Sequence, residues 1–251
     1  PWRDRTGLEN RVAGIFPDKQ AARAYVWARL DREKLAAPPF PPQGRIPNFK
    51  GAAAAAKRLF ELEPWASARR IKVSPDSAQS QVRAEALRRG VEVLVPTPKL
   101  AGGFMLLDPK RIPRDDILKA SARANWEIYA VPVALDALPL LDAIVAGSVA
   151  VTRDGLRAGK GAGYSDLEFA LLRELGHPAV PVATTVHDVQ VVESFPVEAF
   201  DQRMAAIATP TAAWLTGANP ADAPSHIDWS RIDAATLAAM PPLVDIKARR
   251  R

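Results

Sequence analysis

Short apolar runs alternate with segments of helical periodicity through the middle of the chain, and this alternation limits the possible folds more than any other feature. Strands are expected at residues 91–96, 141–147, 148–151 and 181–185, and residues 66–73 lead into a further short strand. Helices are expected at residues 51–62, 79–89 and 166–174. Such alternation is typical of βαβ units. The sequence therefore predicts an α/β protein with a mostly parallel sheet, helices on both faces and ligands beyond the strand ends.

The two ends of the chain differ from this middle. Residues 8–34 are expected to form a helix, because apolar side chains recur there at roughly helical spacing, and the proline-rich residues 38–47 end it. Prolines recur again after residue 211, where a short helix is expected to start at Asp228 and dock on the core. We therefore divide the chain into an N-terminal helical segment with a proline-rich loop, an α/β domain and a C-terminal extension that packs on the domain, at residues 1–44, 45–211 and 212–251.

Composition excludes several kinds of chemistry. The 251 residues include no cysteine, which rules out disulfides, thiolate catalysis, thiolate zinc sites and iron–sulfur clusters. Only three histidines could act as general bases near neutral pH or as imidazole ligands. Serine occurs in no nucleophile elbow, and no pair of carboxylates has a spacing typical of hydrolases, so the sequence points away from covalent catalysis. A bound metal ion is expected to have oxygen ligands.

Hydropathy and charge limit the expected location and binding partners of the protein, but they do not identify a single partner. No run of about 18 apolar residues occurs, and the first residues lack the apolar stretch of a secretory signal, so we expect a cytoplasmic protein without a membrane span. The net charge of +6 and the isoelectric point near 9.8 favour anionic partners. Phosphates, a polyglutamate tail, nucleic acid and an acidic membrane surface all fit this description.

The strongest local signal is the segment Arg-Ala-Gly-Lys-Gly-Ala-Gly-Tyr-Ser-Asp at residues 157–166, between an expected strand and an expected helix. Its alternate glycines let backbone N–H groups approach an anion, and the following helix adds the positive end of its dipole. Arg157 and Lys160 supply the positive charge that two or three phosphates require, and Asp166 could reach a magnesium ion shared with them. We interpret this segment as a cradle for the phosphates of a nucleotide.

Other interpretations of these and neighbouring segments stay open. The glycine spacing matches neither the P-loop nor the dinucleotide fingerprint, and a plain turn explains it equally well. Residues 44–51 carry Arg45 and Lys50 into a helix N-terminus and could bind an anion, although a proline-bearing loop with solvated charges is the simpler explanation. His187 and Asp188 could share a proton-transfer role only across a bend, because neighbouring side chains on a strand point to opposite faces.

The glycine loop resembles the signature of the 5-formyltetrahydrofolate cyclo-ligase (methenyltetrahydrofolate synthetase) family, which reads approximately Arg-Leu-Gly-x-Gly-x-Gly-Tyr-Tyr-Asp-Arg. Residues 157–166 match this signature in register. Further segments resemble the branch called methenyltetrahydrofolate synthetase domain-containing proteins, at residues 45–49, 95–98, 159–168 and 227–230. The resemblance runs from about Arg45 to the C-terminus.

This resemblance implies a fold and a reaction. The fold is a three-layer α/β/α sandwich with a mostly parallel sheet. The reaction uses ATP and Mg²⁺ to convert 5-formyltetrahydrofolate into 5,10-methenyltetrahydrofolate, ADP and phosphate. The formyl oxygen attacks the γ-phosphorus, N10 then closes the ring and phosphate leaves, so the enzyme positions the reactants and stabilises charge without a protein nucleophile.

The resemblance also implies roles for particular residues. Arg157 and Tyr164 would act in catalysis, and Asp166 and Asp201 would coordinate Mg²⁺. Phe104 and Met105 would lie against the folate, although core packing explains them equally well. The residues expected to bind ATP phosphates are Arg45, Lys50, Arg157, Gly159, Lys160, Gly161, Ala162, Gly163, Tyr164, Ser165 and Asp166. The expected partner is a reduced folate, possibly polyglutamylated.

The chain departs from the family pattern at positions expected to lie near the substrate that accepts the phosphate. The second tyrosine of the signature loop is Ser165 here, and the following arginine is Leu167. Residues 74–81 stand where cyclo-ligases carry a Glu-x-x-Thr-like substrate segment. These departures leave three hypotheses: a folate cyclo-ligase, a nucleotide- or folate-binding protein without this activity or with a different acceptor, and a nucleic-acid-binding accessory. The aromatic residues are not arranged as a stacking platform, so nucleic acid is the least expected partner.

Overall fold

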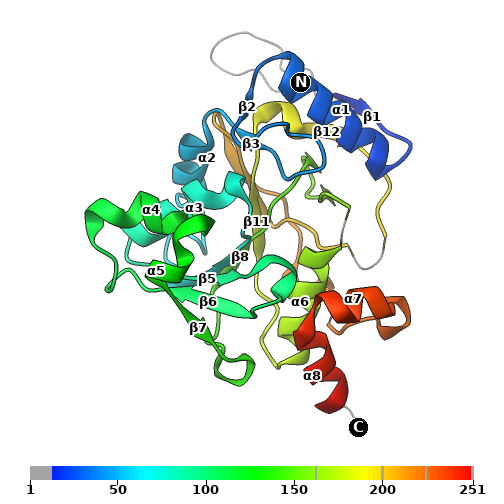
Figure 1. Ribbon diagram of the computed structural model, residues 1–251. Helices are drawn as coiled ribbons and strands as arrows, with labels where there is room; N and C mark the ends of the chain where they lie inside the picture. The colour runs from blue at the N-terminus through cyan, green and yellow to red at the C-terminus, as the bar shows by residue number, and fades with distance from the viewer. Residues whose placement is uncertain (1–12, 162, 199–200, 224, 250–251) are drawn as a thin grey trace.

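The computed structural model describes residues 13–161, 163–198, 201–223 and 225–249 (Figure 1). Within these residues, the main sheet has eight strands in the order β14-β13-β11-β8-β4-β5-β6-β7. The four central pairings join β13, β11, β8, β4 and β5 in parallel, and the three edge pairings are antiparallel. In chain order the strands are β4 (Arg70–Val73), β5 (Glu92–Pro96), β6 (Phe104–Leu107), β7 (Ala130–Val133), β8 (Ala143–Val145), β11 (Val182–Thr185), β13 (Ala206–Ala208) and β14 (Ala213–Leu215).

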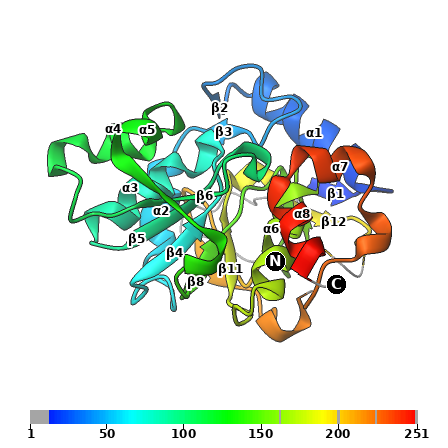
Figure 2. The ribbon, with the colours of Figure 1, turned by 60° about the horizontal axis from the view of Figure 1, so that its bottom comes forward.

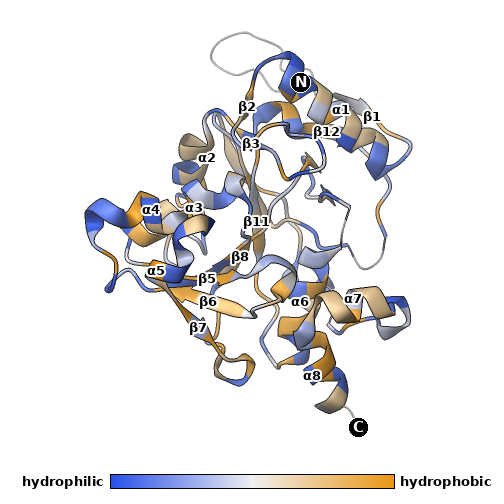
Figure 3. Cartoon of the chain, viewed as in Figure 1, coloured by the Kyte–Doolittle hydropathy of each residue, from blue (hydrophilic) through white to orange (hydrophobic). Residues whose placement is uncertain are grey.

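Helices cover both faces of this sheet, which gives three layers (Figure 2). One face packs against α2 (Ala52–Leu59) and α3 (Ser80–Arg88), and the opposite face packs against α6 (Tyr164–Glu174). Successive residues of the central strands therefore alternate between two buried cores: Val93 and Val95 face the first, and Leu94 faces the second. Both faces are buried, and most residues of the central strands are apolar, as Figure 3 shows.

The C-terminal segment packs on the α6 side of the sheet. Its helices are α7 (Ala234–Ala239) and α8 (Pro241–Arg249). Buried side chains from this segment join the same core cluster as Phe169 and Leu171 of α6; they are Ile227, Met240, Leu243 and Ile246.

A second, smaller sheet lies beside the main one and carries helix α1 (Lys19–Arg32). Its strand order is β1-β12-β9-β10. A third hydrophobic core cluster of the protein joins four buried residues of α1 to Ala150, Ala158 and Val192 of this sheet. The strands are β1 (Ala13–Ile15), β9 (Ala150–Thr152), β10 (Arg157–Ala158) and β12 (Val191–Ser194). A two-stranded pair is formed by β2 (Ala36–Ala37) and β3 (Asn48–Phe49).

The remaining elements are short. Two are α-helical turns, α4 (Ile117–Ser121) and α5 (Trp126–Tyr129). The 3₁₀ turns are η1 (Ser77–Gln79), η2 (Pro98–Leu100), η3 (Arg114–Asp116), η4 (Arg123–Asn125), η5 (Leu135–Ala137), η6 (Asp188–Gln190), η7 (Pro220–Asp222) and η8 (Trp229–Arg231).

The mixed α/β architecture with a mostly parallel sheet confirms the expectation from the sequence. The expected helix at residues 8–34 was wrong in its first half: residues 13–15 form β1, and residues 8–12 lie outside the described part of the chain. Pro17 has no backbone N–H, and the Asp18 carboxylate accepts a hydrogen bond from the Ala21 N–H at 2.7 Å, so the helix begins only at Lys19. The strand expected at residues 148–151 begins later, at Ala150.

The sequence analysis missed β6 and β7, which pair antiparallel with their neighbours and therefore lie outside the βαβ pattern. Pro132 lies in β7, at the edge of the sheet, where one side of the strand needs no ladder hydrogen bond. Among the described helices, none is both long enough and apolar enough to cross a membrane.

Gly155 lies in the turn between β9 and β10, and a substitution there tests how closely Met204 packs against this turn. Its φ is +96°, and a Cβ placed there would lie 2.3 Å from the Met204 carbonyl oxygen. We expect Gly155→Ala to lower the free energy of unfolding by at least about 2 kcal/mol, because an L side chain adds both backbone strain and a backbone clash. Urea unfolding measures the loss.

Gly176→Ala is the matched control. Gly176 has a φ of +86°, but its added Cβ meets no atom within 4 Å, so only the conformational strain of about 1–2 kcal/mol applies. Equal losses in the two variants would contradict the close approach of Met204 to Gly155.

Candidate functional site

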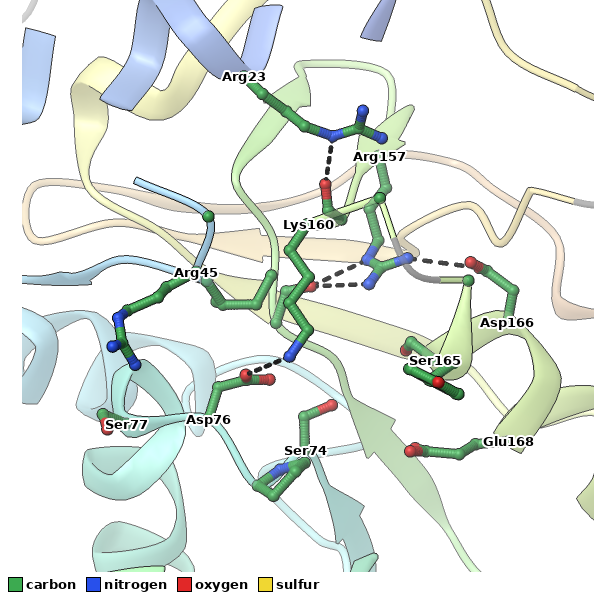
Figure 4. Close-up of a pocket in the computed structure, with 18 of the residues that line it drawn as sticks. Arg23, Arg45, Ser74, Asp76, Ser77, Arg157, Lys160, Ser165, Asp166 and Glu168 are labelled. Carbon is green, nitrogen blue, oxygen red and sulfur yellow. Dashed lines mark hydrogen bonds and ion pairs between the residues drawn. The ribbon is translucent and has the colours of Figure 1, made fainter. Parts of the chain in front are cut away.

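A cavity of about 1580 Å³ lies between α1, the ends of β4 and β8, and the first turn of α6 (Figure 4). Ser74 directly follows β4, and Gly147 lies two residues beyond β8, so the cavity lies beyond the carboxyl ends of parallel strands. Charged side chains that line it are Asp18, Lys19, Arg23, Arg45, Asp76, Arg83, Arg123, Arg157, Lys160, Asp166, Glu168, Glu198, Asp201 and Arg231. A large, charged cavity therefore lies at the strand ends, where the sequence predicts the ligand.

The glycine loop forms one wall of this cavity. It runs from the end of β10 at Ala158 to the first residue of α6, and Gly161 and Gly163 both have positive φ, at +100° and +68°. Gly163 is the N-cap of α6 and has no side chain to satisfy the first N–H groups of the helix. These N–H groups and the positive end of the helix dipole favour an anion at the cavity wall. Ala162, which the sequence also assigns to phosphate binding, lies outside the described residues.

Arg157 connects the loop to the sheet. The residue is 7% exposed, and its guanidinium donates two hydrogen bonds to the Gly147 carbonyl oxygen, at 3.0 Å from Nε and 2.8 Å from Nη2. Nη1 lies 3.3 Å from the Asp166 Oδ1 atom on α6. A Cβ added at Gly159 would lie 2.9 Å from Arg157 Nη2, so glycine lets the loop pass close to the guanidinium.

Helix α1 brings two further cations to the same wall. Arg23 Nε donates to the Gly159 carbonyl oxygen at 2.6 Å, and Lys19, one turn earlier, contacts Asp201. Burial lowers the pKa of Arg23 from its ordinary value, and repulsion from Arg157 lowers it further. Two guanidinium groups and the nearby Lys160 thus concentrate positive charge around the loop, which favours a polyanionic ligand.

The two carboxylates predicted to bind a metal ion, Asp166 and Asp201, both line the cavity. Asp166 contacts Arg157, and Asp201 contacts Lys19 and accepts a hydrogen bond from the Glu198 N–H at 2.6 Å. Among the described residues, no cluster of three or more His, Asp or Glu side chains could enclose a metal ion. Two carboxylates fit the usual Mg²⁺ arrangement, in which substrate phosphates and water supply the other ligands.

The structure brings together most of the remaining predicted residues but not all of them. Tyr164, Ser165, Lys160 and Arg45 line the cavity. Lys50 is exposed and does not line it. Phe104 is fully buried in β6, and Met105 packs against the opposite core cluster, so the structure does not bring either of them to the cavity.

Sequence reasoning missed Arg83 on α3. This buried side chain donates to the Ser74 carbonyl oxygen at 2.5 Å, the Asp76 carbonyl oxygen at 3.3 Å and the Ser121 carbonyl oxygen at 2.8 Å. Burial lowers its pKa to about 9, which still leaves it charged at neutral pH. Arg83 therefore orders the segment after β4 that supplies Ser74 and Asp76 to the cavity. An arginine inside an expected helix gives no local signal of this role.

A buried ion pair between Lys72 on β4 and Glu168 on α6 was also missed. The Lys72 Nζ and Glu168 Oε2 atoms lie 2.5 Å apart, and Glu168 lines the cavity whereas Lys72 does not. The only signal in the sequence was a lysine between two apolar residues, Ile71 and Val73.

His187 and Asp188 do not form a catalytic pair. The His187 Nδ1 atom accepts a hydrogen bond from the Val189 N–H at 3.3 Å and caps η6, and Asp188 accepts hydrogen bonds from the hydroxyls of Thr209 and Thr211. Neither residue lines the cavity. The structure therefore gives His187 a structural role as the cap of η6.

The fold and the site together define an α/β protein with a large cavity at the strand ends, lined by several arginines and lysines. Comparison with known proteins gives its family: residues 17–210 match the 5-formyltetrahydrofolate cyclo-ligase family, and the chain belongs to that family. The match includes α1 and therefore begins earlier than the resemblance seen from the sequence.

Relatives agree with this assignment. The chain is 40% identical over 238 residues to a mouse methenyltetrahydrofolate synthase domain-containing protein, covering 92% of this chain and 63% of the relative. The human protein of the same name is 36% identical over 249 residues, covering 96% of this chain and 64% of the relative. The chain thus spans less than two thirds of these relatives. A 5-formyltetrahydrofolate cyclo-ligase of Escherichia coli K12 is 36% identical over 81 residues, covering 32% and 43% of the two chains.

A solved structure supports the fold. The NMR structure of 5,10-methenyltetrahydrofolate synthetase from Aquifex aeolicus matches with a TM-score of 0.51 and 16% identity, covering 80% of this chain and 94% of the other.

The capping role of His187 gives a test based on pH. Burial is the main cause that lowers its pKa below the ordinary value of 6.5, so protonation favours the unfolded chain. The stability that neutral His187 contributes is present above pH 6.5 and is lost as the pH falls through the lowered pKa. His187→Asn keeps an acceptor for the Val189 N–H but does not titrate.

We expect this variant to lose less unfolding free energy than the wild type when the pH is lowered from about 7.5 to about 5.5 in urea titrations. Replacement of the exposed His226 by asparagine is the control and should leave the wild-type pH dependence unchanged. An equal loss in wild type and His187→Asn would refute the assigned role.

Proposed function

We propose that this protein is an ATP- and Mg²⁺-dependent cyclo-ligase that converts 5-formyltetrahydrofolate into 5,10-methenyltetrahydrofolate, ADP and phosphate. One observation carries the proposal: the glycine loop, two buried or half-buried arginines and two carboxylates line one large cavity in a chain of the cyclo-ligase family. The activity printed in the names of relatives applies to those proteins, and its extension to this chain is part of the proposal.

ATP fits the cavity by charge and by backbone geometry. Gly159, Gly161 and Gly163 line the cavity and place no side chain between the backbone and a ligand, and Arg23, Arg157 and Lys160 lie around them. A triphosphate carries about four negative charges, which an electropositive, partly desolvated wall stabilises strongly. We assign the phosphates of ATP to this wall.

Mg²⁺ fits the same wall. Asp166 and Asp201 would hold it together with phosphate oxygens, and the ion would neutralise charge on the phosphates. Each carboxylate contacts one cation of the protein, Arg157 or Lys19, so their orientation is fixed before a ligand binds. The described residues therefore offer the small carboxylate set that Mg²⁺ commonly uses beside phosphates.

In the proposed reaction the protein positions the two substrates and stabilises the charge that develops. The formyl oxygen forms a bond to the γ-phosphorus as the bond to ADP breaks. N10 then attacks the formyl carbon, the C–O bond to phosphate breaks, and phosphate leaves with the N10 proton. Arg157, which is held by the Gly147 carbonyl, can stabilise negative charge on the transferring group without rearranging. Tyr164 lines the cavity in the first turn of α6, next to the loop, and can orient the group under attack.

A second candidate function is favoured by one observation. Ser165 stands at the second tyrosine of the family loop, and its buried Oγ atom has no hydrogen-bond partner in the structure. A smaller side chain with an unused hydroxyl changes the shape of the acceptor side of the cavity. A protein of this family that binds the nucleotide but accepts a different partner, or only binds a folate, would have such a site.

The absorbance of 5,10-methenyltetrahydrofolate separates the two functions. Purified protein is mixed with 5-formyltetrahydrofolate and MgATP, and a parallel sample omits ATP. We expect an ATP-dependent rise in absorbance. No rise, in a sample that binds MgATP, would refute the proposed reaction and favour the second function.

Asp166→Asn tests the metal assignment. We expect the dissociation constant for MgATP to rise at least about tenfold, which is about 1.4 kcal/mol, because a charged ligand of the ion is lost. The affinity for ATP without Mg²⁺ should not fall, since removing a negative charge does not weaken anion binding. Isothermal titration calorimetry with and without the metal ion measures both values.

The matched control is Asp115→Asn, which changes an exposed aspartate that does not line the cavity. Its affinity for MgATP should equal that of the wild type. An unchanged MgATP affinity in Asp166→Asn, with an unchanged unfolding transition, would contradict the role given to Asp166.

A further inference from the structure

A second cavity, of about 310 Å³, lies beside the large one. Four residues line both cavities, so the two share a wall; they are Arg157, Val197, Glu198 and Asp201. Its volume equals that of roughly ten molecules of liquid water and is at the lower end of the range for small-molecule sites. The second cavity is therefore large enough to hold a small organic molecule.

Most of the lining that belongs to the second cavity alone is apolar. Leu156 lies directly before β10, Val180 and Val182 lie at the start of β11, and Ala205 lies directly before β13. Val180 and Val182 are buried, at 9% and 3% exposed. An occupant with an apolar body would remove this surface from water.

Gln202 adds one polar group to this apolar lining. The residue is 2% exposed and lines the second cavity, and its Nε2 atom is buried without a hydrogen-bond partner among the described residues. Gln190, a buried glutamine elsewhere in the protein, shows the usual arrangement: its Nε2 atom donates to the Ser148 and Val149 carbonyl oxygens at 3.1 Å and 3.0 Å. Because a buried donor without an acceptor is costly, Gln202 calls for an acceptor on an occupant of the cavity.

The charges around the second cavity favour an uncharged occupant. The three charged side chains that it shares with the large cavity, Arg157, Glu198 and Asp201, each have an ion-pair partner. Its other two charged residues, Arg203 and Asp222, are exposed and of opposite sign. A net charge inside the cavity would thus lose its hydration without gaining a dedicated counter-charge.

Water and an organic ligand differ in what they gain here. Water would satisfy the Gln202 amide but would gain nothing from the valine and alanine side chains. A molecule with a carbonyl oxygen on an apolar body satisfies both, because a carbonyl oxygen accepts from an amide N–H while the rest of the molecule covers the apolar lining.

We propose that the second cavity is a ligand site, separate from the large cavity, for a small uncharged molecule whose carbonyl oxygen accepts a hydrogen bond from Gln202 Nε2. The inference goes beyond the proposed reaction, since neither ATP nor a folate is needed to form this site. Gln202 follows Asp201 in the chain, and its backbone N–H lies 3.4 Å from Asp166 Oδ1. The occupant therefore binds next to both carboxylates of the large cavity.

The test uses N-methyl-2-pyrrolidone, an uncharged ring with one carbonyl acceptor and no donor, as the probe. It is titrated into ¹⁵N-labelled protein, and NMR spectra follow the side-chain amide of Gln202 and the backbone N–H of Ala205. We expect both signals to shift together and to saturate. The side-chain amide of Gln190, which already has two acceptors, is the internal control and should not move.

Two variants separate the hydrogen bond from the space. Gln202→Met keeps the length of the side chain but removes the donor, and we expect the probe to bind at least about fivefold more weakly, as followed at Ala205. Ala218→Leu keeps the donor but fills part of the cavity, and it should abolish the shifts. Equal affinity in wild type and Gln202→Met, or no saturable shift at Gln202 in wild type, would overturn the inference.

A titration with saturating MgATP tests whether the two sites are separate. We expect the probe still to bind and to shift the Gln202 amide. Displacement of the probe by MgATP would make the second cavity part of the nucleotide site and would overturn the inference. A failure of the proposed reaction appears in the absorbance of 5,10-methenyltetrahydrofolate and leaves these spectra unchanged, so the two proposals fail independently.

Discussion

The buried guanidinium of Arg157 holds together the parts of the chain that meet at the cavity. A buried charge needs partners on several sides, and Arg157, which is 7% exposed, has them in the Gly147 carbonyl and the Asp166 carboxylate. Gly147 must stay small for this contact, because an added Cβ would lie 2.9 Å from Ile46 and 3.0 Å from Asp76. The end of β8, the strand β10 and the first turn of α6 are thereby fixed relative to one another.

Local patterns predicted the parts of the structure that depend on neighbours in sequence. The alternation of apolar runs and helical segments gave the parallel centre of the sheet, and the glycine spacing of residues 157–166 gave a strand–loop–helix that lines the cavity. In both cases the physical cause, side-chain periodicity or backbone freedom at glycine, acts within a few residues and is visible in the sequence.

Contacts between distant residues could not be predicted in this way. Lys72 and Glu168 are 96 residues apart, and the sequence near either residue does not indicate that the two form an ion pair. Lys19 and Arg23 reach the glycine loop only because α1 packs on the small sheet, so the charges around the cavity depend on tertiary structure. Phe104 is a further case: local hydrophobicity could not decide between a ligand site and core packing for this residue, and in the structure it belongs to the core.

The walls of the cavity come from both sheets, and this has a thermodynamic consequence. Helix α1 and the glycine loop belong to the smaller sheet and its helix, whereas Ser74 and Glu168 belong to the main sheet and α6. A ligand that contacts both sides acts as a cross-link that exists only in the folded state. At a hundredfold excess over its dissociation constant it would add about 2.7 kcal/mol to the free energy of unfolding. Cooperativity between the two sheets therefore increases with ligand concentration, and thermal stability becomes a measure of occupancy.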